Sequence, residues 1–79
     1  MWKGLKIRSE FFRAIISGEK TFEARKNDRN YQKGDLIIFL EWDSSLNDYT
    51  GNSINKEVTY VLEGEEFGIM PGYCVFGIK

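Results

Sequence analysis

The fold of this chain is decided by Leu36-Ile37-Ile38-Phe39-Leu40, a nearly continuous apolar run that extends to Trp42. A short apolar run rich in β-branched and aromatic residues is typical of a buried strand. The turn residues Lys33-Gly34-Asp35 stand directly before it. We therefore expect a central strand that begins at Leu36.

Alternating apolar and polar residues predict four further strands around this one, at residues 5–8, 21–25, 54–62 and 73–78. The apolar residues between residues 11 and 16 recur at helical spacing and predict one helix over residues 10–17. Ser9 fits the N-cap of this helix, and Gly18 fits a left-handed C-terminal stop. We expect loops at residues 26–30, 43–53 and 63–72.

The strand at residues 21–25 carries a clear two-residue period. Because side chains alternate across a strand, Phe22 and Ala24 are expected to face the core. The polar residues Thr21, Glu23 and Arg25 are then expected on the outer face.

Length and composition fit one small domain, residues 1–79. A chain of this size buries only about 60% of its unfolded surface, so it needs a dense core or a staple. Hydrophobic residues make up 42% of the chain and aromatic residues 15%, which favours the dense core. Five short strands and one helix exceed what a flat sheet of this length can bury, so we expect an α+β fold, mainly β, closed into a small pseudo-barrel capped by the helix.

The sequence excludes several function classes. It contains no histidine and a single cysteine, Cys74, so Ser-His-Asp and Cys-His chemistry and ordinary zinc sites are excluded. We expect no metal and no cofactor, and Cys74 to be a buried, inert side chain. No apolar run reaches the roughly 20 residues of a membrane span, and the first residues do not resemble a signal peptide. The expectation is a cytoplasmic protein without a membrane segment.

Charge is unevenly distributed along the chain. Residues 1–33 hold nine Lys or Arg against four Asp or Glu, a net +5, whereas residues 34–79 hold two against eight, a net −6. A basic first half suits an anionic partner. The alternative is that the two halves interleave in the fold and that their charges form ordinary surface pairs.

Polar groups are concentrated in residues 18–31, which make up the candidate site. An arginine fork beside a carboxylate, as in Glu23 and Arg25, can read a planar polar ligand such as a base edge. Phosphates could be held by Lys20, Lys26 and Arg29, with Thr21 beside them. Candidate rings for base stacking are Tyr31, Trp42 and Tyr49.

Each of these residues also has a purely structural interpretation. Lys20 near a helix end can complement the helix dipole, and Glu23 with Arg25 can be a surface ion pair. Tyr31 and Trp42 can belong to the core or to the rim of the barrel.

The motif Gly18-x-Lys20-Thr21-Phe22-Glu23-x-Arg25-Lys26-Asn27-Asp28-Arg29-x-Tyr31 resembles a small bacterial and phage family of the ASCH superfamily. The resemblance runs from about Leu5 to Ile78 and includes Leu5-Lys6-Ile7, Phe12 with Ala14-Ile15, Gly34-Asp35, Glu41-Trp42 and Tyr49-Thr50-Gly51. It implies a PUA-like pseudo-barrel with a cleft between helix and barrel. It also implies a role in binding RNA or modified nucleotides, with Gly18, Lys20, Thr21, Glu23 and Arg25 lining the cleft.

One ASCH branch that resembles this chain hydrolyses acetylated cytidine with the motif lysine and a threonine nucleophile. Lys20 matches that lysine, but Glu23 occupies the place of the nucleophile. The leading hypothesis is therefore a module that binds RNA or a nucleotide. The first alternative is an amidohydrolase of acylated nucleosides with Lys20 and Glu23 as catalytic pair, and the second is a protein-interaction module that uses the acidic half.

Overall fold

Seven elements follow one another in the computed structural model, which describes residues 2–79. They are the strand β1 (Trp2–Arg8), the helix α1 (Ser9–Ser17), the strands β2 (Phe22–Lys26), β3 (Leu36–Asp43) and β4 (Asp48–Leu62), the short 3₁₀ helix η1 (Glu65–Phe67) and the strand β5 (Tyr73–Ile78). Among the described residues no helix has the length and apolarity needed to cross a bilayer.

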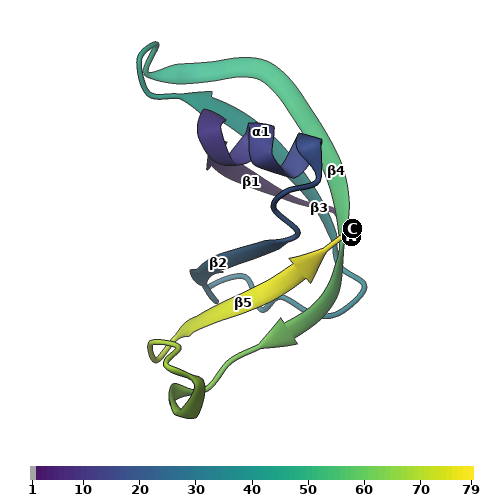
Figure 1. Cartoon of the computed structure of the whole chain (residues 1–79), viewed down its shortest axis with the longest axis vertical. Coiled ribbons are helices and arrows are strands. Elements are labelled where there is room, and N and C mark those ends of the chain that lie inside the picture. Colours follow the sequence, from purple (N-terminus) through teal and green to yellow (C-terminus); the bar gives the residue numbers. More distant parts are fainter. Residues whose placement is uncertain (1) are drawn as a thin grey trace.

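The strands form one five-stranded mixed sheet in the order β1-β3-β4-β5-β2. β1 pairs with β3 in parallel, and the other neighbouring strands are antiparallel. Figure 1 shows that the sheet curves strongly and that α1 lies on its concave side. The expected α+β fold, mainly β, with five strands and one helix is confirmed. β1 and β2 are the two ends of the strand order, and their edges face each other across an opening.

The core lies on the concave side of the sheet. Its fully buried side chains come from several elements and are Ile15, Ile37, Phe39, Val58, Cys74 and Phe76. The expected burial of Cys74 is confirmed, and burial raises the pKa of its thiol. β3 is paired on both sides as expected, although β4 holds the central place among the five strands.

The helix α1 packs on the sheet through one face. Phe12 and Ile15 are buried, whereas Phe11 and Ile16 lie on its exposed side. Gly18 ends the helix with a φ of 85°, as expected for a left-handed C-cap. The N-cap prediction was wrong, because the helix already includes Ser9, whose Oγ donates a hydrogen bond to the Trp42 carbonyl at 3.2 Å.

The hairpin of β3 and β4 is longer than the sequence suggested. The predicted loop at residues 43–53 is mostly strand, since β4 already begins at Asp48. The buried carboxylate of Glu41 accepts hydrogen bonds from Thr50 Oγ1 at 2.8 Å and from Asn52 Nδ2 at 3.0 Å. These bonds from Asn52 and Thr50 lower the pKa of Glu41. An ionised carboxylate thus fixes the bulge that lies between the two strands.

The predicted facing of β2 was wrong. In the ladder with β5, Glu23 lies opposite Phe76 and Arg25 opposite Cys74, and both of these partners are buried. Glu23 and Arg25 therefore face the concave side, whereas Phe22 is 50% exposed on the outer face. Alternation in the sequence shows that two faces exist, but not which of them is the inner one.

Candidate functional site

Two arginine side chains cross the opening between β1 and β2. Arg25 Nη2 donates a hydrogen bond to the Lys6 carbonyl at 2.7 Å, and Arg29 Nη1 donates one to the Gly4 carbonyl at 2.8 Å. Both acceptors belong to the edge strand β1, whose other edge pairs with β3. Each guanidinium has five N–H donors, so both arginines are anchored and still have donors to spare.

Glu23 organises the inner face of β2. Its Oε1 lies 2.5 Å from Lys20 Nζ, and its Oε2 lies 3.4 Å from Arg25 Nε. The Glu23 side chain is only 10% exposed and that of Lys20 only 14%. Two cations therefore offset the desolvation of this carboxylate, and it in turn fixes the direction of the Arg25 guanidinium.

The Lys20 side chain is enclosed by aromatic rings as well as by its ion pair. Its Nζ lies 5.5 Å from the ring centroid of Phe11 and 5.4 Å from that of Phe22. Ammonium groups at such distances are attracted to the ring faces. Lys20 thus reaches the Glu23 carboxylate between one ring of α1 and one ring of β2.

Two neighbouring hollows occupy the opening, and they share Lys6 and Arg25. The first has a volume of about 350 Å³ and is lined by Gly4, Leu5, Lys6, Arg25, Lys26, Asp28, Arg29 and Tyr31. The second has about 310 Å³ and is lined by Lys6, Ile7, Arg8, Phe11, Glu23, Ala24 and Arg25. We call them together the β1–β2 cleft. Its lining holds five cationic residues and two acidic ones, in a chain whose net charge is −1.

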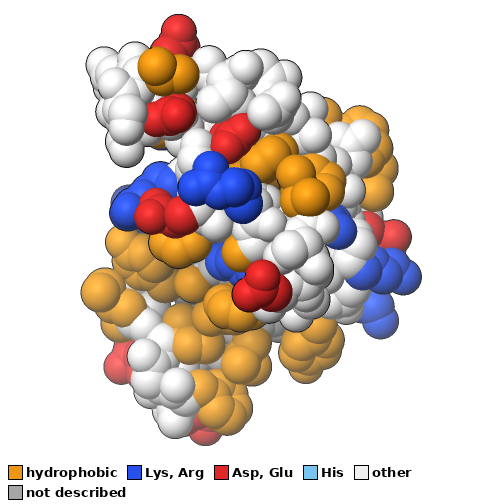
Figure 2. Space-filling view, turned by 45° about the horizontal axis from the view of Figure 1, so that its top comes forward, with side chains coloured by type: hydrophobic (Ala, Val, Ile, Leu, Met, Phe, Trp, Pro, Cys, Tyr) orange, Lys and Arg blue, Asp and Glu red, His pale blue; other side chains and the backbone are white. Residues whose placement is uncertain are grey.

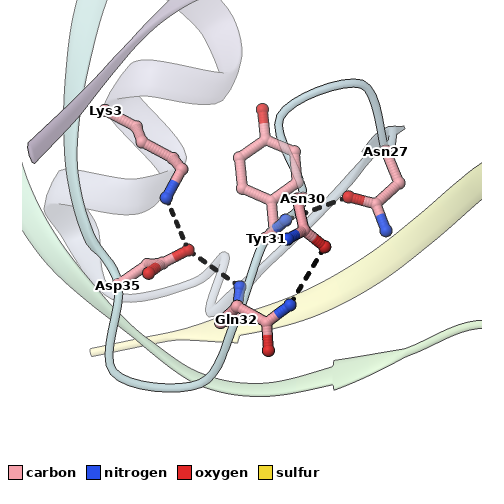
Figure 3. A network of polar contacts seen from close by, with 6 residues as sticks. All are labelled: Lys3, Asn27, Asn30, Tyr31, Gln32 and Asp35. Atoms are coloured by element: carbon pink, nitrogen blue, oxygen red, sulfur yellow. Dashed lines mark hydrogen bonds and ion pairs between the residues drawn. The ribbon is translucent and has the colours of Figure 1, made fainter. Parts of the chain in front are cut away.

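The loop after β2 is held by its own polar contacts, shown in Figure 3. Asn27 Oδ1 accepts a hydrogen bond from the Tyr31 backbone N–H at 3.0 Å, and Asp35 Oδ2 accepts one from the Gln32 backbone N–H at 2.8 Å. Lys3 Nζ lies 2.8 Å from the same Asp35 oxygen. Burial alone would raise the pKa of Asp35, but the bonds from Lys3 and Gln32 outweigh it and lower the pKa.

Tyr31, a predicted stacking ring, is a core residue in the structure. It is 3% exposed, and its ring centroid lies 4.7 Å from that of Phe76. Burial raises the pKa of its hydroxyl, although the nearby charges of Arg25 and Arg29 oppose that effect. Tyr31 therefore forms the floor of the first hollow, where a base cannot stack on its covered face.

Three other predicted residues lie outside the cleft. Thr21 is exposed, and its carbonyl accepts a hydrogen bond from the Ile78 backbone N–H at 2.9 Å. Trp42 and Tyr49 contact each other edge to face at 5.1 Å between ring centroids, at the far end of the β3–β4 hairpin. Neither ring lines the cleft, although Trp42 contacts the lining residue Lys6, whose Nζ lies 4.0 Å above its ring.

The structure brings together Glu23, Arg25, Lys26 and Arg29 in the cleft, with Lys20 behind Glu23. The prediction from sequence missed the residues that β1 contributes, Gly4, Lys6 and Arg8, and it also missed Asp28. The alternation of Lys6 and Arg8 with buried residues was visible in the sequence. Whether these two side chains line a cleft depends on β1 being an edge strand, and no local sequence pattern indicates an edge strand.

Comparison with known proteins gives a family and one relative. A family model described as "Domain of unknown function (DUF3850)" matches residues 3–78. An uncharacterized 12.9 kDa protein in the GpA 3′ region of Escherichia phage P2 is 34% identical over 59 residues. The match covers 75% of this chain and 52% of the phage protein, so the chain spans about half the length of that relative.

Proposed function

The chain belongs to the DUF3850 family, domains of unknown function, and we propose that it is a PUA-like domain of the ASCH superfamily that binds RNA or a nucleotide in the β1–β2 cleft. The strand order supports a pseudo-barrel, because β1 and β2 end the sheet and face each other. Arg25 and Arg29 span the opening in place of a backbone ladder.

One observation carries the proposal: anchored arginines with free donors line a basic cleft. Arg25 is fixed by the Lys6 carbonyl and by Glu23, and Arg29 by the Gly4 carbonyl. Donors held in place in this way lose little side-chain entropy when a ligand binds. Their remaining N–H groups suit phosphate oxygens or the acceptor edge of a base.

The size of the cleft suits one nucleotide at a time. Its two hollows, of about 350 and 310 Å³, lie near the lower end of the range of roughly 300 to 1,000 Å³ for ligand pockets. Lys26 and Arg29 are exposed cations of the first hollow and would meet phosphate, whereas the third exposed cation, Lys6, lies over the Trp42 ring. Arg25, directed by Glu23, would meet the base edge. A free nucleotide and a single unpaired residue of an RNA strand share this chemistry.

The amidohydrolase alternative would use the buried pair of Lys20 and Glu23. In the structure the Lys20 ammonium is engaged by the Glu23 carboxylate at 2.5 Å, and both oxygens of that carboxylate face cations. Neither group is free to attack an amide carbon. If acylated nucleosides are hydrolysed by the protein but not by a Lys20→Ala variant, the alternative holds and binding is only its first step.

The binding proposal is tested by fluorescence anisotropy of a short labelled single-stranded RNA at several salt concentrations. The test variant is Lys26→Ala with Arg29→Ala. The matched control is Lys33→Ala with Lys79→Ala, which removes two exposed cations outside the cleft. We expect the test variant to lower the magnitude of the salt slope by about 1.4, the value for two lost single-strand phosphate contacts.

Equal salt slopes for the test variant and the control would contradict the assignment of the cleft. Competition by unlabelled mononucleotide separates the two ligand sources. Displacement at micromolar concentration indicates a free nucleotide, and its absence indicates RNA.

A further inference from the structure

A second exposed surface lies at the end of the molecule that carries the loop after β4. We call it the acidic apolar surface. Its large side chains are exposed by 66% at Tyr60, 37% at Leu62, 60% at Phe67, 63% at Met70 and 41% at Tyr73. Figure 2 shows hydrophobic side chains gathered over the lower end of the molecule, and Figure 1 places the loop with η1 there. Apolar groups clustered in this way on a small domain are typical of an interaction surface.

The surface includes a hollow of its own. It has a volume of about 450 Å³, and its lining includes Glu63, Glu65, Met70, Pro71 and Tyr73. The loop around it turns at Gly64, Gly68 and Gly72, all of which have positive φ. Glycine adopts such backbone conformations without the steric cost that other residues meet.

The segment that forms this surface is acidic, although Lys33 lines a neighbouring hollow with Tyr60 and Glu63. Residues 57–78 contain four glutamates, Glu57, Glu63, Glu65 and Glu66, and no lysine or arginine. Lys26 lies opposite Tyr73 in the β2–β5 ladder, so the basic cleft begins where this surface ends. Phosphate groups would be repelled here, whereas a cationic partner would be attracted.

We propose that the acidic apolar surface binds a protein segment that combines an apolar anchor with lysines or arginines around it. The anchor enters the hollow beside Met70 and Tyr73, and the cations meet Glu63 and Glu65. Aromatic and methionine side chains suit the centre of such an interface because they give large contact areas, and methionine adapts its shape. This site is independent of the β1–β2 cleft.

The probe is a labelled 14-residue helical peptide made of leucine and lysine, compared with one in which glutamate replaces every lysine. Anisotropy titrations use the full chain at two salt concentrations. We expect the Leu-Lys peptide to bind at least about 10-fold tighter than the Leu-Glu peptide and to weaken with salt. Equal binding of the two peptides, or no saturable binding of either, overturns the proposal.

Variants locate the binding. The double variant Phe67→Ser with Met70→Ser should lower the affinity for the Leu-Lys peptide about 10-fold. The double variant Glu65→Gln with Glu66→Gln should lower this affinity about 3-fold and make it less dependent on salt. The matched controls are Leu46→Ser, an apolar side chain 66% exposed at the other end of the molecule, and Glu19→Gln. If the controls weaken binding as much as the test variants do, the surface is wrongly assigned.

Other occupants are distinguished in the same series. Concentration-dependent dimerisation of the free protein that Phe67→Ser with Met70→Ser abolishes would identify a second copy and overturn the proposal. The variant Lys26→Ala with Arg29→Ala should not weaken peptide binding, because it removes only cations beside the surface, so this inference and the proposed cleft can fail separately.

Discussion

At the scale of single residues, the Glu23 carboxylate links the fold to the cleft. It is a nearly buried anion between Lys20 and Arg25, and Arg25 in turn holds the edge of β1. Removing one member of a buried ion pair leaves the others uncompensated, which costs more than the pair itself contributes.

Glu23→Ala should therefore lower the free energy of unfolding by about 3 kcal/mol. The control is Glu19→Ala, an exposed carboxylate four residues earlier whose loss should change stability by less than about 0.5 kcal/mol. Urea unfolding of both variants measures the difference. Similar stability of the two variants would show that Glu23 is no more than a surface group.

Tyr31 and Tyr49 have opposite roles in the structure although both were stacking candidates. Tyr31→Ala should cost about 3 to 5 kcal/mol, because its ring packs in the core against Phe76. Tyr49→Ala should cost about 0.5 to 1.5 kcal/mol, because it mainly removes the contact with Trp42. Thermal unfolding of the two variants compares their stabilities. A larger loss of stability in Tyr49→Ala than in Tyr31→Ala would contradict the described packing.

At the scale of elements, local patterns predicted the existence of each strand and of the helix, but not their pairing. The strand at Leu36–Leu40 and the end of the helix at Gly18 depend on residues that are neighbours in the sequence, so both could be predicted from it. The facing of β2 depends on its pairing with β5 and on Lys20 and Arg25, which compensate the charge of Glu23. The early start of β4 depends on Glu41, which lies in another strand.

The cleft was predictable only in part for the same reason. Its cations Arg25, Lys26 and Arg29 are close together in the sequence, and their concentration was a visible signal. Its other wall, with Gly4 and Lys6, comes from β1 and is placed by the parallel pairing of β1 with β3. This parallel pairing joins segments about 30 residues apart, and no sequence pattern in either segment indicates it.

The hairpin of β3 and β4 should loosen when its buried carboxylate is lost. In a Glu41→Ala variant we expect faster amide exchange at residues 48–53, because Thr50 and Asn52 lose their acceptor. Exchange in β5 should stay unchanged. Glu10→Ala, which removes only an exposed pair with Arg8, is the control. A uniform rise in exchange across the chain would contradict a local anchor.

At the scale of the whole molecule, the titrating groups predict a broad stability plateau with losses at both ends. The pKa values of Asp35 and Glu41 lie below their ordinary values of 3.8 and 4.5, so the unfolded chain takes up protons first and stability falls as pH drops below about 5. The pKa values of Cys74 and Tyr31 lie above 9.0 and 10.0, so the unfolded chain loses protons first and stability falls above about pH 9.

Urea midpoints between pH 3 and pH 11 measure this profile. Because the chain has no histidine, we expect the midpoint to stay level from about pH 5.5 to 8. A Cys74→Val variant should lose less stability than the parent between pH 8.5 and 10. A step near pH 6.5 in the parent protein would contradict the assignment of the titrating groups.

The whole molecule also separates its charges by place. The β1–β2 cleft is basic, and the acidic apolar surface begins on the other side of Lys26. Part of the charge asymmetry of the sequence is thus kept on these two surfaces, whereas other charges of the two halves lie together, as in the ion pair of Lys3 with Asp35. Two surfaces of opposite charge suit two ligands of different kinds.

The central claim is that the β1–β2 cleft binds a nucleotide, and amide shift mapping tests it most directly. Labelled protein is titrated with mononucleotides and with short single-stranded RNA at low and at physiological salt. We predict saturable shifts at residues 4–8 and 23–31 that weaken with salt, and no shifts at residues 62–73. Shifts confined to residues 62–73, or no shifts with either ligand, would contradict it.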